Sequence, residues 1–106
     1  MIKVGIIGCG KMADQHKMQI ERIYGAKIVG VCDSEILMAR QMAERCNIDK
    51  YFTNVHEMLD AAGPDVVNIT TPPASHYSLA KICLEAGCNV YVEKPFTLNS
   101  SEAEDI

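Results

Sequence analysis

Short apolar segments alternate with longer segments of mixed polarity along the 106 residues of the chain. The apolar segments have the length of β-strands, and the longer segments carry apolar residues at helical spacing together with charges. This alternation is typical of repeated strand-helix-strand units. We predict strands at residues 2–7, 26–32, 51–53, 65–70 and 88–93.

The longer predicted strands are apolar at nearly every position, which suits a parallel sheet that helices cover on both faces. Helices are predicted at residues 11–23, 34–46, 54–62 and 72–86. Ser34 and Asn54 are the expected N-caps, and Pro72 and Pro73 open the last helix. Right-handed crossovers then give an α/β fold with three layers, αβα, and a doubly wound parallel sheet of strand order 3-2-1-4-5. Its ligand crevice should lie at the carboxyl ends of the first and fourth strands.

A glycine-rich turn, GCGKMA at residues 8–13, follows the first predicted strand and opens the first helix. In this context the G-x-G-x-x-A pattern is the signature of a dinucleotide site. The first glycine permits a tight turn, the second lets a pyrophosphate approach the backbone, and Ala13 keeps the helix close to the strand. The helix N-terminus then faces the anion. The residues of this turn predicted to contact a cofactor are Gly8, Cys9, Gly10, Lys11 and Met12.

Asp33 stands at the end of the second predicted strand, where a carboxylate can accept hydrogen bonds from ribose hydroxyls. Its negative charge would also repel the additional phosphate of NADP, so NAD is the expected cofactor, with NADP still possible. The alternative is that Asp33 only caps the helix that follows.

Two further segments follow strands at the same edge of the sheet. Thr70, Thr71, Pro72 and His76 are candidates to line the nicotinamide ribose, although the segment also suits an ordinary strand-to-helix turn with a structural histidine. His16 and His56 are expected to be structural. After the fifth strand, the Lys94 ammonium can steady a developing alkoxide and take part in proton transfer. Spacing alone equally fits a solvated lysine.

The composition supports one domain and excludes several classes of function. A 106-residue chain with 48% apolar residues buries one core. Its net charge of -4, with scattered Lys and Arg, argues against nucleic acid and membrane partners. The five cysteines form no CxxC pair, so we expect free thiols and no metal site. The start of the chain lacks the features of a signal peptide, and a cytoplasmic location is the default expectation.

Taken together, these motifs resemble the N-terminal domain of the Gfo/Idh/MocA oxidoreductases over nearly the whole chain. The matching segments are GCGKMA, the CD pair at 32–33, TTPPASHYSLA at 70–80 and AGCNVYVEKPFTLNSSEA at 86–103. The resemblance implies a Rossmann domain over residues 1–106, followed in the full-length protein by a substrate and oligomerisation domain that this chain does not contain.

The same resemblance implies roles for individual residues. Lys94 would be a catalytic residue near the nicotinamide, Glu93 would help to form the cofactor site, and a second-domain histidine would complete the catalytic residues. The implied activity is an NAD(P)-dependent dehydrogenase acting on CH-OH groups of sugars, inositols or related polyols, in a homo-oligomer. The isolated chain would then bind cofactor without turnover. The alternative hypothesis is a non-catalytic NAD-binding sensor or regulatory module.

Overall fold

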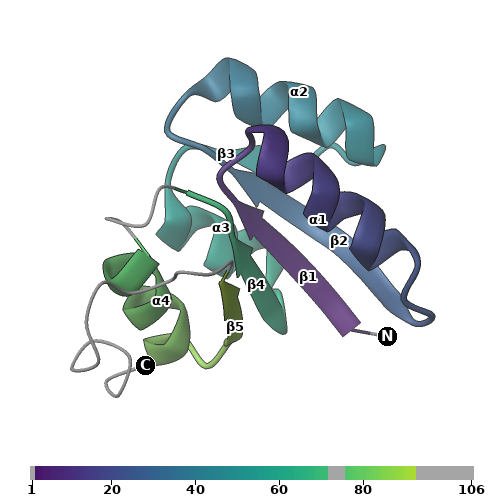
Figure 1. Ribbon diagram of the computed structural model, residues 1–106. Helices are drawn as coiled ribbons and strands as arrows, with labels where there is room; N and C mark the ends of the chain where they lie inside the picture. The colour runs from purple at the N-terminus through teal and green to yellow at the C-terminus, as the bar shows by residue number, and fades with distance from the viewer. Residues whose placement is uncertain (1, 72–75, 93–106) are drawn as a thin grey trace.

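Parallel strands form a central sheet in the computed structural model, which describes residues 2–71 and 76–92 (Figure 1). The sheet has five strands in the order β3-β2-β1-β4-β5. They are β1 (Ile2–Ile7), β2 (Ala26–Cys32), β3 (Tyr51–Phe52), β4 (Val66–Ile69) and β5 (Asn89–Val92). The order confirms the prediction, because the chain reverses its direction of travel across the sheet between β3 and β4 as a doubly wound fold requires.

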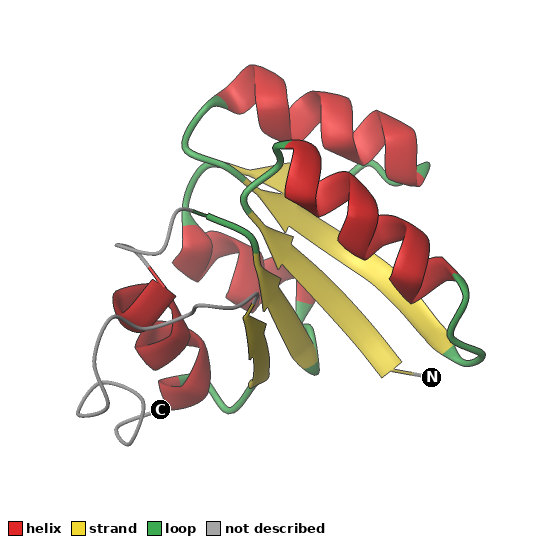
Figure 2. Cartoon of the chain, in the orientation of Figure 1, coloured by secondary structure: helices red, strands yellow, loops and turns green. Residues whose placement is uncertain are grey.

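Helices cover both faces of this sheet (Figure 2). They are α1 (Lys11–Glu21), α2 (Ile36–Cys46), α3 (Val55–Ala62) and α4 (His76–Glu85). The first two pack on one face and the last two on the other, so the predicted three-layer αβα architecture is confirmed. No helix within residues 2–71 and 76–92 has the length and apolar character needed to cross a membrane.

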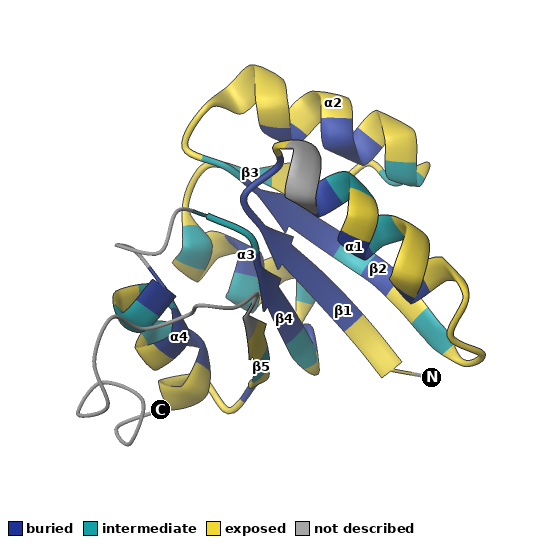
Figure 3. Cartoon of the chain, viewed as in Figure 1, coloured by how far each residue is buried: buried dark blue, intermediate teal, exposed yellow. Residues whose placement is uncertain are grey.

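The hydrophobic core is divided by the sheet into two parts (Figure 3). On one face Ile6 and Val31 pack with Met42 of α2, and on the other face Val67 and Ile69 lie in one cluster with Met58 of α3. All six side chains are fully buried. Because successive strand residues point to opposite faces, burial on both sides explains why the strands read as continuous apolar runs.

Close packing of α3 against the sheet depends on Gly30 of β2. A Cβ atom at this position would lie 2.9 Å from the Cβ of Ala62 and 3.3 Å from Cγ of Met58. Both contacts are shorter than ordinary van der Waals separations. The absence of a side chain at Gly30 therefore lets α3 approach the sheet.

Two helix starts test the predicted caps. Asn54 caps α3 as predicted, since its side chain accepts a hydrogen bond of 3.1 Å from the Glu57 amide. The prediction of Ser34 as the cap of α2 is wrong, because the helix begins at Ile36 and Glu35 occupies the N-cap position. The Pro72 and Pro73 start predicted for α4 lies outside the described residues, and within them this helix begins at His76.

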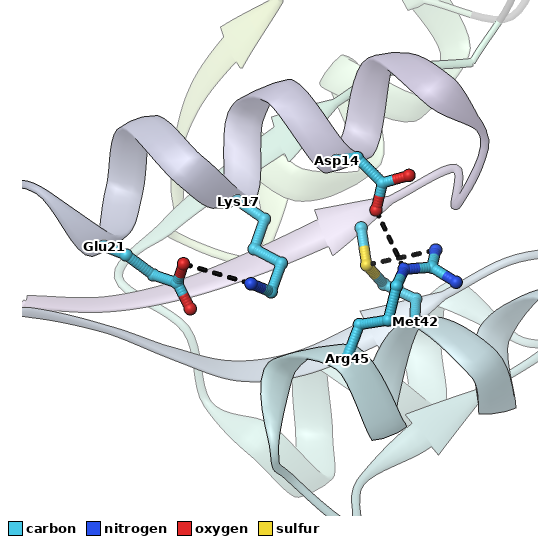
Figure 4. Close-up of polar contacts among 5 residues, drawn as sticks. All are labelled: Asp14, Lys17, Glu21, Met42 and Arg45. Atoms are coloured by element: carbon cyan, nitrogen blue, oxygen red, sulfur yellow. Dashed lines mark hydrogen bonds and ion pairs between the residues drawn. The ribbon is translucent and has the colours of Figure 1, made fainter.

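Ion pairs form on the exposed surface of α1 and α2 (Figure 4). Arg45 of α2 donates from Nε to Oδ1 of Asp14 in α1 at 2.9 Å, and Lys17 pairs with Glu21 at 3.0 Å within α1. Exposed pairs of this kind contribute about 0–1 kcal/mol. The position of α1 is therefore set mainly by its buried side chains, Ala13, His16 and Ile20.

Candidate functional site

The carboxyl ends of all five strands lie in one row across the sheet. Phe52 pairs with Cys32, Cys32 with Ile7, Ile7 with Ile69, and Ile69 with Val92. The loops that follow β1, β2 and β4 therefore leave the sheet at the same level, and they begin with Gly8, Asp33 and Thr70. The structure brings these three predicted site residues together at one edge.

A cleft of about 570 Å³ lies at this edge. Its volume is in the range of small-molecule sites. Six of the predicted residues line it, namely Gly8, Cys9, Gly10, Asp33, Thr70 and Thr71. The residues of its wall that the sequence analysis missed include Ser34, Glu35, Met38, Thr53, Val55 and Leu79. Thr53 directly follows β3, so selecting polar residues directly after a strand, as for Asp33 and Thr70, was sufficient to find it. Met38 and Leu79 lie within helices, and no sequence pattern marks them as cleft residues.

The two glycines of the turn have different steric surroundings. Gly8 has φ +92°, and a Cβ there would lie 2.9 Å from Oγ1 of Thr70. Gly10 has φ -86°, which any residue can adopt, and a Cβ there would meet no atom of the described residues within 4 Å. Gly8 is therefore required by the turn itself, while the space in front of Gly10 is open to a ligand.

Gly10 also occupies the N-cap of α1, where no side chain of the described residues forms a capping hydrogen bond. The first amide groups of a helix have no acceptor within the helix, and they carry the positive end of its dipole. An open helix start of this kind binds anions such as a pyrophosphate. Ala13, which is fully buried, holds the first turn against the core as predicted.

Asp33 is held by two backbone amides. Its Oδ2 accepts a hydrogen bond from the Cys9 amide and its Oδ1 accepts one from the Glu35 amide, both at 2.8 Å. The residue therefore shapes the turn before α2 without being the N-cap of that helix. A carboxylate has about four acceptor positions, so two remain for other donors such as ribose hydroxyls.

The side chains of Thr70 and His76 both form hydrogen bonds with backbone carbonyl oxygens. Thr70 donates from Oγ1 to the carbonyl oxygen of Gly8 at 2.6 Å. His76 is 3% exposed and donates from Nε2 to the carbonyl oxygen of Thr71. His76 is not among the residues that line the cleft, and its hydrogen bond connects the first residue of α4 to the Thr71 backbone.

The other histidines lie away from the cleft. His16 is buried on the inner side of α1, and its Nδ1 accepts a hydrogen bond of 3.0 Å from the side-chain amide of Asn68. Its ring also meets that of Tyr91 edge to face, with 5.6 Å between the ring centroids. His56 is exposed on α3. These positions agree with the predicted structural roles.

Several predicted site residues are not characterised by these contacts. Pro72, Glu93 and Lys94 lie outside the described residues, and for Lys11 and Met12 only their place at the start of α1 is described. The chain reaches Glu93 directly after Val92, whose backbone pairs with Ile69 at the cleft edge. The roles of all five residues stay predictions.

All five cysteines are free thiols, as predicted. Burial, together with the negative charge of Asp33, raises the pKa of the Cys9 thiol from 9.0 to about 12. Burial also raises the pKa of Cys32 to about 11 and that of Cys83 to about 12. Neutral thiols are weak nucleophiles and poor metal ligands, so the position of Cys9 in the glycine-rich turn does not make it reactive.

These raised pKa values predict that the folded chain loses stability at alkaline pH. Between the unfolded pKa of 9.0 and a folded pKa near 11 or 12, the unfolded chain releases thiol protons that the folded chain retains. Each such thiol then lowers the free energy of unfolding by about 1.4 kcal/mol per pH unit. Urea unfolding at pH 8, 9, 10 and 11 measures the slope. Cys83→Ala should reduce it, and an unchanged slope in that variant would contradict the assignment to buried thiols.

Comparison with known proteins identifies similar domains. A family model described as an oxidoreductase family with an NAD-binding Rossmann fold matches residues 2–106. The D-glucoside 3-dehydrogenase of Escherichia coli K12 is 34% identical over 106 residues, which cover 99% of this chain and 30% of that protein. The scyllo-inositol 2-dehydrogenase (NAD(+)) of Bacillus subtilis is 32% identical over 104 residues, covering 97% of this chain and 30% of that protein.

A solved structure has the same fold. The WlbA dehydrogenase from Chromobacterium violaceum, in complex with NADH and UDP-GlcNAcA, superimposes with a TM-score of 0.90 at 28% identity. The match covers 98% of this chain and 30% of the WlbA chain. The chain thus spans about 30% of the length of the relatives that it matches.

Proposed function

Because the chain belongs to the oxidoreductase family with an NAD-binding Rossmann fold, we propose that it is the nucleotide-binding part of an NAD-dependent dehydrogenase. The observation that carries this proposal is the glycine-rich turn. Gly10 leaves open space in front of an uncapped helix start, and Asp33 presents spare acceptor positions at the rim of the same cleft. These are the features that a pyrophosphate and a ribose require.

Different residues of the cleft would bind different parts of the cofactor. The first amides of α1, following Gly10, would receive the pyrophosphate, and the Asp33 carboxylate would accept from the adenosine ribose hydroxyls. Thr53 and Val55 line the adjoining wall of the cleft and would flank the adenosine. Asp33 and Glu35 place two acidic residues at this end of the cleft, which disfavours the additional phosphate of NADP.

The proposed substrates are sugars, inositols or related polyols. The names of the E. coli and B. subtilis relatives describe a glucoside and an inositol dehydrogenase, which supports this class. Bound NAD supplies a hydride acceptor at nicotinamide C4. Lys94 would hydrogen-bond the substrate hydroxyl and take part in moving its proton, because it follows β5 at the cleft edge of the sheet. The reacting carbon is then part of a CH-OH group.

The chain by itself is proposed to bind cofactor without turnover. It spans about 30% of the relatives' length, and the remaining length would supply the further walls of the substrate site and a second acid or base. A site without these walls cannot exclude water or orient a polyol. Assembly into a homo-oligomer stays a prediction for the full-length protein.

Calorimetric titration with NADH and NADPH tests this proposal. We expect NADH to bind at least about tenfold more tightly than NADPH, because the negative charge of Asp33 repels the additional phosphate. Asp33→Ala should weaken NADH binding about tenfold and reduce the preference for NADH over NADPH. Asp49→Ala, which changes an exposed carboxylate outside the cleft, is the matched control and should bind like the wild type. Absence of binding by a folded chain, or tighter binding of NADPH, would refute the proposal.

A further inference from the structure

We propose that Thr70 and Asp33 are positioning residues that hold the Gly8–Cys9 peptide group in one orientation and thereby shape the anion site. This inference rests on the proposed function for its consequence, but its geometric basis is independent of any ligand. This peptide group is the first one within the glycine-rich turn, one residue after the end of β1 at Ile7. Its two polar atoms are bound from opposite sides of β1.

The hydrogen bonds come from the strands that flank β1. The carbonyl oxygen of Gly8 accepts from Oγ1 of Thr70 at 2.6 Å, at the end of β4. The Cys9 amide donates to Oδ2 of Asp33 at 2.8 Å, at the end of β2. Because a peptide group is planar and its C=O and N–H point in opposite directions, these two bonds fix the rotation of the whole plane.

The turn needs such restraint because Gly8 has little conformational preference of its own. Glycine populates positive and negative φ values with similar ease, so φ +92° is allowed but not enforced by the sequence. The Gly8 amide adds a bond of 2.8 Å to the carbonyl of Cys32, which anchors the start of the turn. The side chains of Thr70 and Asp33 then determine the backbone conformation of the residues that follow Gly8.

The fixed peptide decides which amides face an anion. The Cys9 amide is directed to Asp33, so the groups offered to a pyrophosphate are those that follow it, at the start of α1. Asp33 is restrained in return, because the Cys9 and Glu35 amides occupy one position on each of its oxygens. The Asp33 carboxylate thus links the conformation of the glycine-rich turn to the acceptor positions available for a ribose.

This arrangement changes the role predicted for Thr70. The sequence suggested direct contact with the nicotinamide ribose, yet the Thr70 hydroxyl donates its hydrogen to Gly8, with a second, longer contact of 3.2 Å to the Ile7 carbonyl. Thr70 therefore acts on the cofactor through the turn. The effect should extend to ligands that contain no nicotinamide ribose at all.

The test compares Thr70→Val, which keeps the side-chain shape and removes the hydroxyl, with Thr70→Ser, which keeps the hydroxyl. Binding of NADH and of ADP is measured by calorimetry, because ADP carries a pyrophosphate but no nicotinamide ribose. Amide hydrogen exchange of Cys9 is measured by NMR without ligand, with Met42 in α2 as the reference for global unfolding. We expect Thr70→Val to weaken ADP and NADH equally, by about three- to tenfold.

Exchange at Cys9 should quicken about threefold or more in Thr70→Val while Met42 is unchanged, and Thr70→Ser should restore both properties. Weaker NADH binding with unchanged ADP binding would overturn the inference in favour of direct contact. Unchanged exchange at Cys9 would also overturn it. If the wild-type chain binds neither ligand, the proposed function fails, and the exchange measurement still decides whether Thr70 holds the peptide.

Discussion

Replacing Lys94 with alanine in the full-length protein should lower kcat by about 10²- to 10⁴-fold while NADH affinity stays within about threefold. A general acid or base contributes that much to turnover, because it acts on the proton that moves with the reaction. The cofactor contacts assigned to Gly10 and Asp33 lie on the loops after β1 and β2, and Lys94 follows β5. Turnover and NADH binding are measured separately by steady-state kinetics and calorimetry.

The matched control is Lys81→Ala, which removes an exposed lysine from α4 and should leave both quantities unchanged. A sensor or regulatory module has no chemical step to lose. If the full-length protein oxidises polyols and Lys94→Ala retains more than about a tenth of the wild-type kcat, the catalytic role of Lys94 is wrong.

The second large effect is a difference between alanine substitutions at the two glycines of the turn. Gly10→Ala should leave the chain folded, because its φ is ordinary and, within residues 2–71 and 76–92, its Cβ would meet no atom closer than 4 Å. The added methyl group would instead occupy the space proposed for the pyrophosphate. Losing one hydrogen bond to a charged group costs about 1.5–3 kcal/mol, so NADH affinity should fall roughly 10- to 150-fold.

Gly8→Ala should show the opposite pattern and destabilise the fold. A Cβ at this position would lie 2.9 Å from Thr70 Oγ1, and φ +92° is strained for any residue with a side chain. Backbone strain of this kind costs about 1–3 kcal/mol, which urea unfolding measures. Each variant is the control for the other. Equal destabilisation by both, or unimpaired NADH binding by Gly10→Ala, would contradict the steric distinction.

The sheet could be predicted from sequence because two physical constraints reinforce each other. Strands buried on both faces must be apolar throughout, as Val4–Ile7 and Val31–Cys32 are. The right-handed crossover then leaves few ways to connect them. Asn54 was also predictable, since a capping bond depends only on residues three positions apart.

The start of α2 was not predictable in the same way. Asp33, Ser34 and Glu35 are all polar residues before an apolar helix, and the choice among them depends on tertiary structure. Asp33 is drawn to the Cys9 amide, 24 positions away in the chain, and its other oxygen binds Glu35. Helix geometry then begins only after Glu35.

The role of Thr70 shows a second limit. A motif indicates which residues lie near a site, and Thr70 does line the cleft. Whether a hydroxyl faces the ligand or the protein depends on the nearest acceptor, here the Gly8 carbonyl in the turn after β1, 62 positions away in the chain. Side-chain direction across a parallel sheet is determined by contacts distant in sequence, which local patterns do not contain.

The central position of β1 also has a consequence for biosynthesis. β1 pairs with β2 after a connection that contains α1. Its other edge stays unpaired until β4 is made, since Val4 pairs with Val66, 62 positions later (66 minus 4). At about 5–20 residues per second, translation leaves this edge unpaired for roughly 3–12 seconds. During that interval the apolar strand is open to incorrect pairing with other chains. Slowing or stalling of the ribosome before β4 should therefore promote aggregation more than the same delay after it.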